Sequence, residues 1–278
     1  MKVLDKEILA ESQGVVIVKL VIQAPDIAAK AKAGQFVVLM VKEEGERIPL
    51  TIVEADAAGG RITLIAQAAG LTTRLLVNIG KGDALYSLVG PLGHPTEIKP
   101  YGKIVLVGGG VGIAEIYPVA KAMKEAGNHI TTIIGARSRG LLILERNLRE
   151  VSDAVVVMTD DGSYGRKGFV TEPLKELLTK EKYNLVYAVG PLPMMQAVSG
   201  VTKPLAVPTL VSLNALMVDG TGMCGCCRVR VAGKVKFSCV DGPEFDAAEV
   251  DWQELAKRNS AYCEQEKHVC RLNPAGKP

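Results

Sequence analysis

Cysteine is absent from the first 223 residues of this 278-residue chain. A small secreted domain held by disulfides would spread its cysteines along the sequence, so this absence argues against a disulfide framework. Long apolar runs are also missing, because Lys19, glycines and other charged residues interrupt each run before it reaches the roughly 18 residues of a membrane span. The N-terminal residues 1–7 include two acidic residues and are followed by no apolar segment of signal-peptide form. We therefore expect a soluble, cytoplasmic protein.

A strong excess of one charge is lacking too. Thirty-three Lys and Arg residues stand against 30 Asp and Glu residues, and this net charge of +3 does not favour nucleic acid or an anionic membrane as the partner. Hydrophobic residues make up 48% of the chain and charged residues 23%, which excludes a disordered protein. The length suffices for one large domain or two to three modest ones.

The first part of the chain, residues 1–99, consists of short β-rich runs separated by glycines and charged turn residues. Strands at this spacing predict a β-sandwich or a small β-barrel. Prolines at 91, 95 and 100 mark the end of this part. The runs are 15–22, 35–41, 50–53, 61–67 and 83–89.

The second part, residues 100–215, has an α/β pattern. Residues 104–107 are continuously apolar, as in a strand buried on both faces of a parallel sheet, and a helix is expected to follow through Lys124. Alternating strands and helices predict a βαβ series. The further predicted strands are 130–134, 154–158, 185–189 and 209–213. The third part, residues 216–278, reads as a cysteine-rich loop, a hairpin of 228–231 with 235–237, and a polar tail.

A glycine-rich turn follows the first strand of the second part. It reads Gly108, Gly109, Gly110, Val111 and Gly112. Such a turn presents backbone N–H groups and a helix dipole to a phosphate, although a tight strand-to-helix connection without a ligand is the alternative. The strict G-x-G-x-x-G spacing is absent, and arginines at 137 and 139 replace the acidic residue expected after the second strand, which by itself favours NADP(H).

Together with Gly190-Pro191-Leu-Pro-Met-Met, the glycine-rich turn resembles the nicotinamide domain of the ferredoxin-NADP reductase superfamily. That superfamily places an FAD-binding β-barrel first. Residues 47–51 (Arg-Ile-Pro-Leu-Thr) resemble the strand of this barrel that lies against the isoalloxazine ring. Residues 70–74 (Gly-Leu-Thr-Thr-Arg) resemble the turn that receives the flavin phosphates, and Gly90-Pro-Leu-Gly93 matches the segment at the end of the barrel. Many members carry Cys where this chain has Val189. The resemblance implies cofactor binding by Arg47, Ile48, Pro49, Leu50, Thr51, Ile65, Ala66, Gln67, Gly70, Thr72, Thr73, Gly108, Gly109, Gly110, Val111, Gly112, Arg137, Gly190 and Pro191.

Four of the six cysteines lie within sixteen residues, which favours a metal or cluster site in a reducing compartment. Plant-type ferredoxins bind a [2Fe–2S] cluster with the spacing C-x4-C-x2-C and a later fourth cysteine. Here that frame gives Asp219, Cys224, Cys227 and Cys239, with the carboxylate in the first ligand position. Cys226 is then a spare thiol.

Two other interpretations of the cysteine loop stay open. A tetrahedral zinc site could use Cys224, Cys227, Cys239 and either Cys226 or Cys263, although a zinc ribbon usually supplies a second close cysteine pair. Alternatively, Asp219 only caps the glycine-rich loop and Cys226 is the fourth cluster ligand.

A flavin barrel, a nucleotide domain and a C-terminal cluster loop together resemble one branch of the superfamily. This branch contains the electron-transfer subunit of dihydroorotate dehydrogenase, which has four Cys ligands, and the small subunit of the NADH-dependent reduced ferredoxin:NADP oxidoreductase (sulfide dehydrogenase), which has one Asp. Asp219 favours the latter, an electron-bifurcating transhydrogenase. The resemblance implies FAD, NAD(H) and a [2Fe–2S] cluster, with a larger flavin and [4Fe–4S] partner that handles NADP(H) and ferredoxin. The alternatives are electron delivery for dihydroorotate oxidation and a non-catalytic zinc adaptor.

Overall fold

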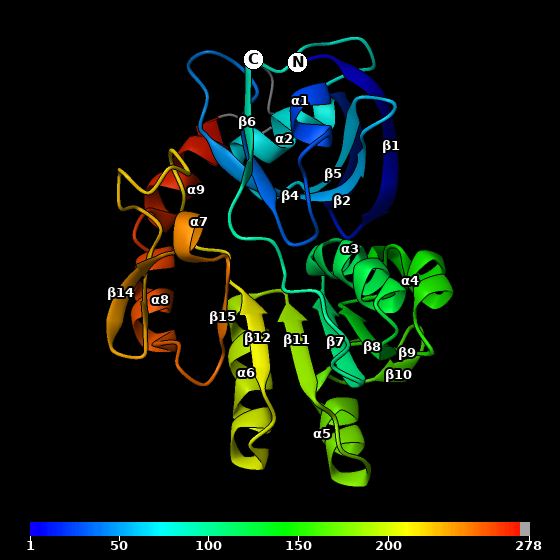
Figure 1. The fold of residues 1–278 in the computed structure, drawn as a ribbon. Coiled ribbons are helices and arrows are strands. Elements are labelled where there is room, and N and C mark those ends of the chain that lie inside the picture. Colours follow the sequence, from blue (N-terminus) through cyan, green and yellow to red (C-terminus); the bar gives the residue numbers. More distant parts are fainter. Residues whose placement is uncertain (273–278) are drawn as a thin grey trace.

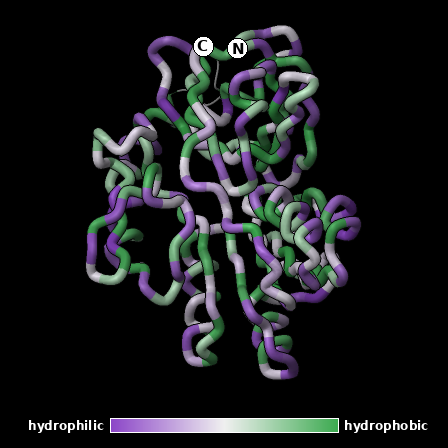
Figure 2. Tube along the Cα trace, in the orientation of Figure 1, coloured by the Kyte–Doolittle hydropathy of each residue, from purple (hydrophilic) through white to green (hydrophobic). Residues whose placement is uncertain are grey.

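The computed structural model describes residues 1–272 as two β-sheets with a C-terminal segment beside them. In Figure 1 the N-terminal sheet lies above the second sheet, and the orange and red C-terminal segment runs along the side of both. Figure 2 shows hydrophobic and hydrophilic stretches alternating along the trace. Within residues 1–272, no helix is long and apolar enough to cross a membrane.

The N-terminal sheet has six antiparallel strands in the order β1-β2-β5-β4-β3-β6. Its strands are β1 (Val3–Ser12), β2 (Val15–Gln23), β3 (Phe36–Met40), β4 (Ile48–Asp56), β5 (Arg61–Gln67) and β6 (Ser87–Leu92). Helices α1 (Pro25–Ala28) and α2 (Leu71–Asn78) lie in its connections. In the described part of the chain no ladder joins the edge strands β1 and β6, so the sheet is not a closed barrel, and a single bridge between Lys2 and Ala84 links its edges.

Two details of this sheet differ from the sequence prediction. The sequence does not predict strand β1, because only Val3 and Ala10 are buried in it and the charged residues Asp5, Lys6 and Glu7 follow one another between them. An edge strand of this kind shows little of the alternation that identifies a half-buried strand. The last strand, predicted over 83–89, is found at Ser87–Leu92.

The second sheet has seven strands in the order β10-β9-β8-β7-β11-β12-β15, all parallel except β15. Its strands are β7 (Lys103–Gly109), β8 (His129–Ala136), β9 (Ala154–Thr159), β10 (Arg166–Lys167), β11 (Leu185–Val189), β12 (Thr209–Ser212) and β15 (Glu244–Asp246). The connecting helices are α3 (Gly112–Glu125), η1 (Arg139–Leu141), α4 (Glu145–Val151), α5 (Thr171–Lys180), α6 (Leu192–Thr202) and η2 (Lys203–Leu205). This confirms the expected α/β arrangement.

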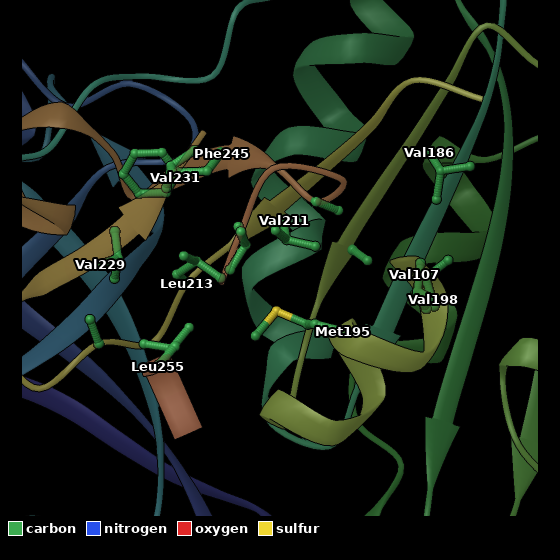
Figure 3. Close-up of a cluster of buried hydrophobic side chains, with 14 of the residues drawn as sticks. Val107, Val186, Met195, Val198, Val211, Leu213, Val229, Val231, Phe245 and Leu255 are labelled. Carbon is green, nitrogen blue, oxygen red and sulfur yellow. The ribbon is translucent and has the colours of Figure 1, made fainter. Parts of the chain in front are cut away.

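Strand β7 is buried on both faces, as its apolar run predicts. Ile104 and Leu106 pack in one cluster with residues of α3 and α4, whereas Val105 and Val107 pack in another with residues of α5 and α6. The second cluster extends across β12 to the C-terminal segment, and Figure 3 shows its side chains converging. Because successive side chains of a strand point to opposite faces, helices must cover both sides of this sheet.

The C-terminal segment contains the predicted hairpin and three helices. These elements are β13 (Arg228–Val231), β14 (Lys234–Phe237), α7 (Ser238–Asp241), α8 (Trp252–Asn259) and α9 (Cys263–Leu272). The predicted polar tail is polar, and its residues form helices α8 and α9, which were not predicted, while residues 273–278 lie outside the described residues. Helix α8 is polar overall, yet it places Leu255 in the core beside Val229 and Val231.

A buried polar cluster joins the parts of the chain. Glu244 of β15 accepts a hydrogen bond of 2.8 Å from the Tyr187 hydroxyl of β11 and another from the Thr96 hydroxyl, which precedes the second sheet. Gly34, before β3, lies next to Glu244. A Cβ atom on Gly34 would come within 2.8 Å of the Glu244 carboxyl oxygen, so a larger residue would clash there. Burial raises the pKa of Glu244. This carboxyl therefore holds the segment before the second sheet against strands β11 and β15.

Candidate functional site

The glycine-rich turn and the Gly-Pro pair lie side by side in the structure. Strand order reverses between β7 and β11, and ligands of open α/β sheets bind at the carboxyl ends of such strands. Gly109 ends β7 and leads into Gly110–Gly112, Gly190–Pro191 follow β11, and both segments line one cavity of about 600 Å³. This volume lies within the range of about 300–1,000 Å³ for small-molecule sites.

Gly110 and Gly112 shape this wall in different ways. A Cβ atom on Gly112 would meet the Val189 carbonyl oxygen at 2.5 Å, so α3 approaches β11 more closely than any side chain allows. Gly110 has φ +56°, and a Cβ atom there would point into open space. The turn therefore leaves room for a ligand against its backbone.

The opposite wall of the cavity comes from the N-terminal sheet and α2. Its residues include predicted FAD-binding residues from three segments: Ile48, Pro49, Leu50 and Thr51; Ile65, Ala66 and Gln67; and Gly70, Thr72 and Thr73. The structure thus brings 16 of the 19 predicted cofactor-binding residues around one space.

The start of α2 is organised by its own side chains. The Thr73 hydroxyl accepts hydrogen bonds from the Ala69 and Gly70 amides at 2.9 and 3.0 Å, and the Thr72 hydroxyl donates to Glu46 at 2.6 Å. A Cβ atom on Gly70 would meet nothing within 4 Å. The N-terminal end of this helix consequently opens onto the cavity, as expected for a phosphate-binding turn.

Three predicted cofactor-binding residues do not line the cavity. Gly108 is buried in β7, where a Cβ atom would meet Ile116 of α3 at 2.8 Å, so its small size serves helix packing. Arg47 is exposed in the loop before β4, and Arg137 is exposed after β8. Nearby, the Arg139 guanidinium lies over the Tyr164 ring, 5.2 Å from its centre.

Glu115, in the first turn of α3, is a cavity residue that the sequence analysis did not select. Burial raises the pKa of its carboxyl to about 7, and a hydrogen-bonding interaction with the Thr51 side chain opposes that rise. The sequence does contain an indication of this residue, because Glu115 lies three positions after Gly112, next to the place expected for an anionic phosphate.

The raised pKa of Glu115 predicts a pH-dependent stability. Between its ordinary value of 4.5 and about 7 the folded state binds the proton more tightly than the unfolded state, so this carboxyl lowers the free energy of unfolding as pH rises through that window. We expect Glu115→Gln to remove the dependence and to be more stable than the wild type at pH 8. Urea unfolding of the cofactor-free proteins across pH 5–8 measures this difference, and parallel curves would contradict it.

The third side of the cavity belongs to the C-terminal segment. Leu213, Asn214 and Met217 follow β12, while Val269 and Cys270 come from α9. No local sequence pattern indicates these residues, because their position depends on how α9 packs against α2.

The cysteine loop lies between β12 and α7. Cys227 and Cys239 are buried, with their sulfur atoms 3.1 Å apart, whereas Cys224 is exposed. Cys239 lies in α7 immediately after β14. Gly220, Gly222 and Gly225 all have positive φ, which lets the loop fold back over these thiols.

Asp219 belongs to the same group of side chains. Its carboxylate accepts hydrogen bonds from the Thr221 and Cys224 amides at 2.9 and 3.2 Å, and these bonds hold the pKa of Asp219 below its ordinary value. Its charge also acts on Cys226 and Cys239. Asp219 is thus an ionised ligand candidate beside the thiols.

This donor set suits iron–sulfur chemistry. Thiolates supply three of the four predicted ligands, and Cys thiolates are the usual ligands of [2Fe–2S] clusters. In residues 1–272 no three His, Cys, Asp or Glu side chains are arranged to hold a single metal ion. The spare thiol, Cys226, is partly buried in the same loop, and burial raises its pKa.

A parallel sheet with a glycine-rich turn, an N-terminal sheet facing it across a cavity and a thiol-rich loop define an oxidoreductase of the ferredoxin-reductase type. Residues 106–200 match the oxidoreductase NAD-binding domain, and residues 214–251 match the iron-sulfur cluster binding domain of dihydroorotate dehydrogenase B. The predicted ferredoxin-reductase-like fold, NAD-binding domain and iron–sulfur domain are thereby confirmed, whereas the predicted N-terminal barrel is an open sheet.

Several similar proteins are named as electron transfer subunits. The chain is 50% identical over 246 residues to a homologue of the dihydroorotate dehydrogenase B (NAD+) electron transfer subunit from Thermotoga maritima, covering 88% of this chain and 87% of that protein. It is 32% identical to the corresponding subunit from Geobacillus thermodenitrificans, covering 81% and 88%. The chain belongs to this family.

A solved structure adds a second point of similarity. A chain in the structure of an NADH-dependent reduced ferredoxin-NADP oxidoreductase, described for its flavin-based electron bifurcation, matches with a TM-score of 0.90 and 47% identity. The match covers 96% of this chain and 95% of that one. Amycolatopsis cytochrome P450 reductase shares the fold at 22% identity, with a TM-score of 0.63 over 73% and 65% of the two chains.

Proposed function

We propose that this chain is the electron-transfer flavoprotein subunit of an electron-bifurcating transhydrogenase. It exchanges hydride between NAD(H) and FAD and passes single electrons through a [2Fe–2S] cluster to a larger partner, which handles NADP(H) and ferredoxin. Residues 1–99 hold FAD, residues 100–215 hold NAD(H) and residues 216–278 hold the cluster. The observation that carries the proposal is that two predicted cofactor motifs, one from each sheet, line the same cavity.

The cavity supports binding of two cofactors in contact. Bound FAD would supply the conversion between hydride transfer and single-electron transfer. The backbone of Gly109–Gly112 and Gly190–Pro191 positions the nicotinamide nucleotide, while β4 and the start of α2 position the flavin. Hydride transfer requires proximity and orientation, so Val189 in place of the common cysteine is compatible with it.

Asp219 supports the bifurcating enzyme over the dihydroorotate-linked one. Its carboxylate lies at the start of the cysteine loop, where the C-x4-C-x2-C frame places a thiolate. A carboxylate is a harder ligand than a thiolate and changes the electronic properties of the cluster. The alternative function, electron delivery for NAD-dependent dihydroorotate oxidation, is favoured by the names of the sequence relatives.

The number of cysteines implies a separate electron acceptor. After Asp219, Cys224, Cys227 and Cys239 are assigned, only Cys226, Cys263 and Cys270 remain, too few for a [4Fe–4S] cluster. The subsequent one-electron chemistry thus requires a larger partner subunit. Co-purification from the native source tests this proposal: we expect a flavin- and [4Fe–4S]-containing partner that reacts with NADP(H), whereas a dihydroorotate-oxidising partner would establish the alternative.

We propose NAD(H) as the nucleotide of this chain. Arg137 does not line the cavity, and Arg139 is engaged with Tyr164, so neither supports recognition of a 2′-phosphate. Rapid-mixing measurements of flavin reduction with NADH and with NADPH test this preference. A strong preference for NADPH in the isolated subunit would reverse the assignment. A zinc adaptor, in contrast, would be colourless and unreactive with both nucleotides.

Substitution of Asp219 by cysteine tests the fourth cluster ligand. We expect Asp219→Cys to keep a [2Fe–2S] centre with altered EPR g-values and a changed reduction potential, because a thiolate replaces the harder carboxylate. Asp161→Cys is a suitable control, since Asp161 also accepts hydrogen bonds in a glycine-containing turn but lies outside the cysteine loop. Spectra identical to those of the wild type would show that Asp219 is not a ligand.

A further inference from the structure

Helix α8 carries an arginine that contacts the cysteine loop. The Arg258 guanidinium donates a hydrogen bond of 3.0 Å from Nη2 to the Cys226 carbonyl, which lies 32 positions earlier in the chain. The helix itself is held in place, because Leu255 packs in the core and the Asp251 amide donates to the Arg230 carbonyl at 2.9 Å. In Figure 1, α8 lies beside the hairpin strand β14. Arg258 therefore reaches the loop from a fixed element.

The hydrogen bond orients the peptide that precedes a predicted cluster ligand. The Cys226–Cys227 peptide is trans, and the carbonyl and N–H groups of a planar trans peptide point in opposite directions. Since the Cys226 carbonyl is turned toward Arg258, the Cys227 N–H points away from that guanidinium. Hydrogen bonds to the sulfur atoms are among the factors that set the potential of an iron–sulfur cluster. Arg258 thus fixes the direction of one backbone donor of the loop.

The charge of Arg258 is only partly neutralised. Oε1 of Glu254, one turn earlier in α8, lies 4.0 Å from Nε of Arg258, which is too far for a hydrogen bond. Arg258 Nε and Glu254 Oε2 are both buried and have no hydrogen-bond partner among residues 1–272. The Arg258 side chain is 26% exposed, so water and salt screen its charge less than that of a surface residue. Because a guanidinium stays protonated, this positive charge is permanent.

A positive charge beside the loop favours a reduced cluster. A [2Fe–2S] cluster becomes more negative when it accepts an electron, so a nearby cation stabilises the reduced state and raises the reduction potential. Resting on the function proposed above, we propose that Arg258 is a positioning residue that holds the Cys226–Cys227 peptide and raises the reduction potential of the cluster. Glu254 opposes this effect. The pair thereby determines how readily reduced flavin passes single electrons to the cluster.

Redox titration of the cluster, followed by EPR, tests the role of Arg258. In Arg258→Gln we expect the equilibrium for one-electron reduction of the cluster to become about tenfold less favourable, which corresponds to a potential about 59 mV lower. Arg258→Lys keeps the charge and should restore most of the wild-type potential. Lys257→Gln, which removes an exposed cation from the same helix, is the matched control and should leave the potential unchanged.

Glu254→Gln separates the effect of charge from a structural effect. This variant removes the opposing charge but keeps the capping bond of α8, which the Glu254 backbone amide donates to Asp251. The potential should therefore rise, opposite in sign to the shift in Arg258→Gln. Mere loosening of the loop would lower the iron content and would give no shift of opposite sign. If Arg258→Gln loses its iron, the direction of the shift in Glu254→Gln decides.

Two results would overturn the proposed role of Arg258. They are an unchanged potential in Arg258→Gln with full iron content, and an unchanged or lower potential in Glu254→Gln. Mediators and dithionite set the potential in this titration, so the measurement needs neither NADH nor a partner subunit. A cluster that dithionite reduces but NADH does not would contradict the proposed function alone, while the shifts in these variants still decide the role of Arg258.

Discussion

Replacement of Cys227 by serine is expected to remove most of the iron from the protein. The Cys227 side chain is 2% exposed and its sulfur lies 3.1 Å from that of Cys239, at the centre of the cysteine loop. Serine is a poor ligand for iron in a sulfur-rich cluster, so the remaining residues cannot hold it. Iron and sulfide content per chain and the EPR spectrum of the reduced protein measure the loss. Flavin content should not change, because Cys227 does not line the cavity.

Two further variants make this result specific. Cys263→Ser removes a thiol from α9, outside the cysteine loop, and should keep the iron content of the wild type. Cys226→Ser should also keep it, because Cys226 is the spare thiol of the proposed ligand set. Loss of iron from Cys226→Ser would assign that residue as the fourth ligand instead of Asp219, and full iron content in Cys227→Ser would contradict the cluster assignment.

The second large effect is expected from aspartate at Gly110. The φ of +56° at this position is tolerated by Asp, and the added side chain would project into open space at the glycine-rich turn. A carboxylate there would occupy the expected position of the dinucleotide phosphates and repel them. We expect Gly110→Asp to weaken NADH binding by about 100-fold, equivalent to about 2.8 kcal/mol, with flavin and iron retained.

Gly127→Asp is a matched control for this substitution. Gly127 follows the C-terminal end of the same helix, has φ +83° and would also place a Cβ atom in open space, but it does not line the cavity. The control therefore carries the same charge and comparable backbone strain. Stopped-flow reduction at a series of NADH concentrations gives the dissociation constant for both variants. Equal weakening in the two would show that the turn after β7 is not the nucleotide site.

Much of the nucleotide-binding sheet could be predicted, because apolar residues at consecutive positions show that both faces of a strand are buried. The unbroken apolar run 104–107 requires cover on two sides, and the structure supplies it with α3 and α4 on one face and α5 and α6 on the other. The glycines after this run also carried local information, since Gly110 has a positive φ and Gly112 lies where any Cβ atom would clash with Val189.

Features that depend on tertiary packing could not be predicted in the same way. Helix α9 is exposed along much of its length, and its contribution to the cavity depends on its contact with α2. The pairing of Thr51 with Glu115 joins residues 64 positions apart on different elements. The start of helix α8, by contrast, could be predicted from its D-x-x-E pattern. Asp251 accepts a hydrogen bond of 3.0 Å from the Glu254 amide, as an N-terminal capping residue does.

Anaerobic titration of the cofactor-loaded chain with NADH tests the central claim most directly. If the chain connects NAD(H), FAD and a [2Fe–2S] cluster, NADH should bleach the visible flavin absorption and produce the EPR signal of a reduced [2Fe–2S] centre in the same sample. Gly110→Asp should require much more NADH for both changes, and Cys227→Ser should show only the flavin change. A protein whose flavin and cluster are reduced by dithionite but not by NADH would contradict the account.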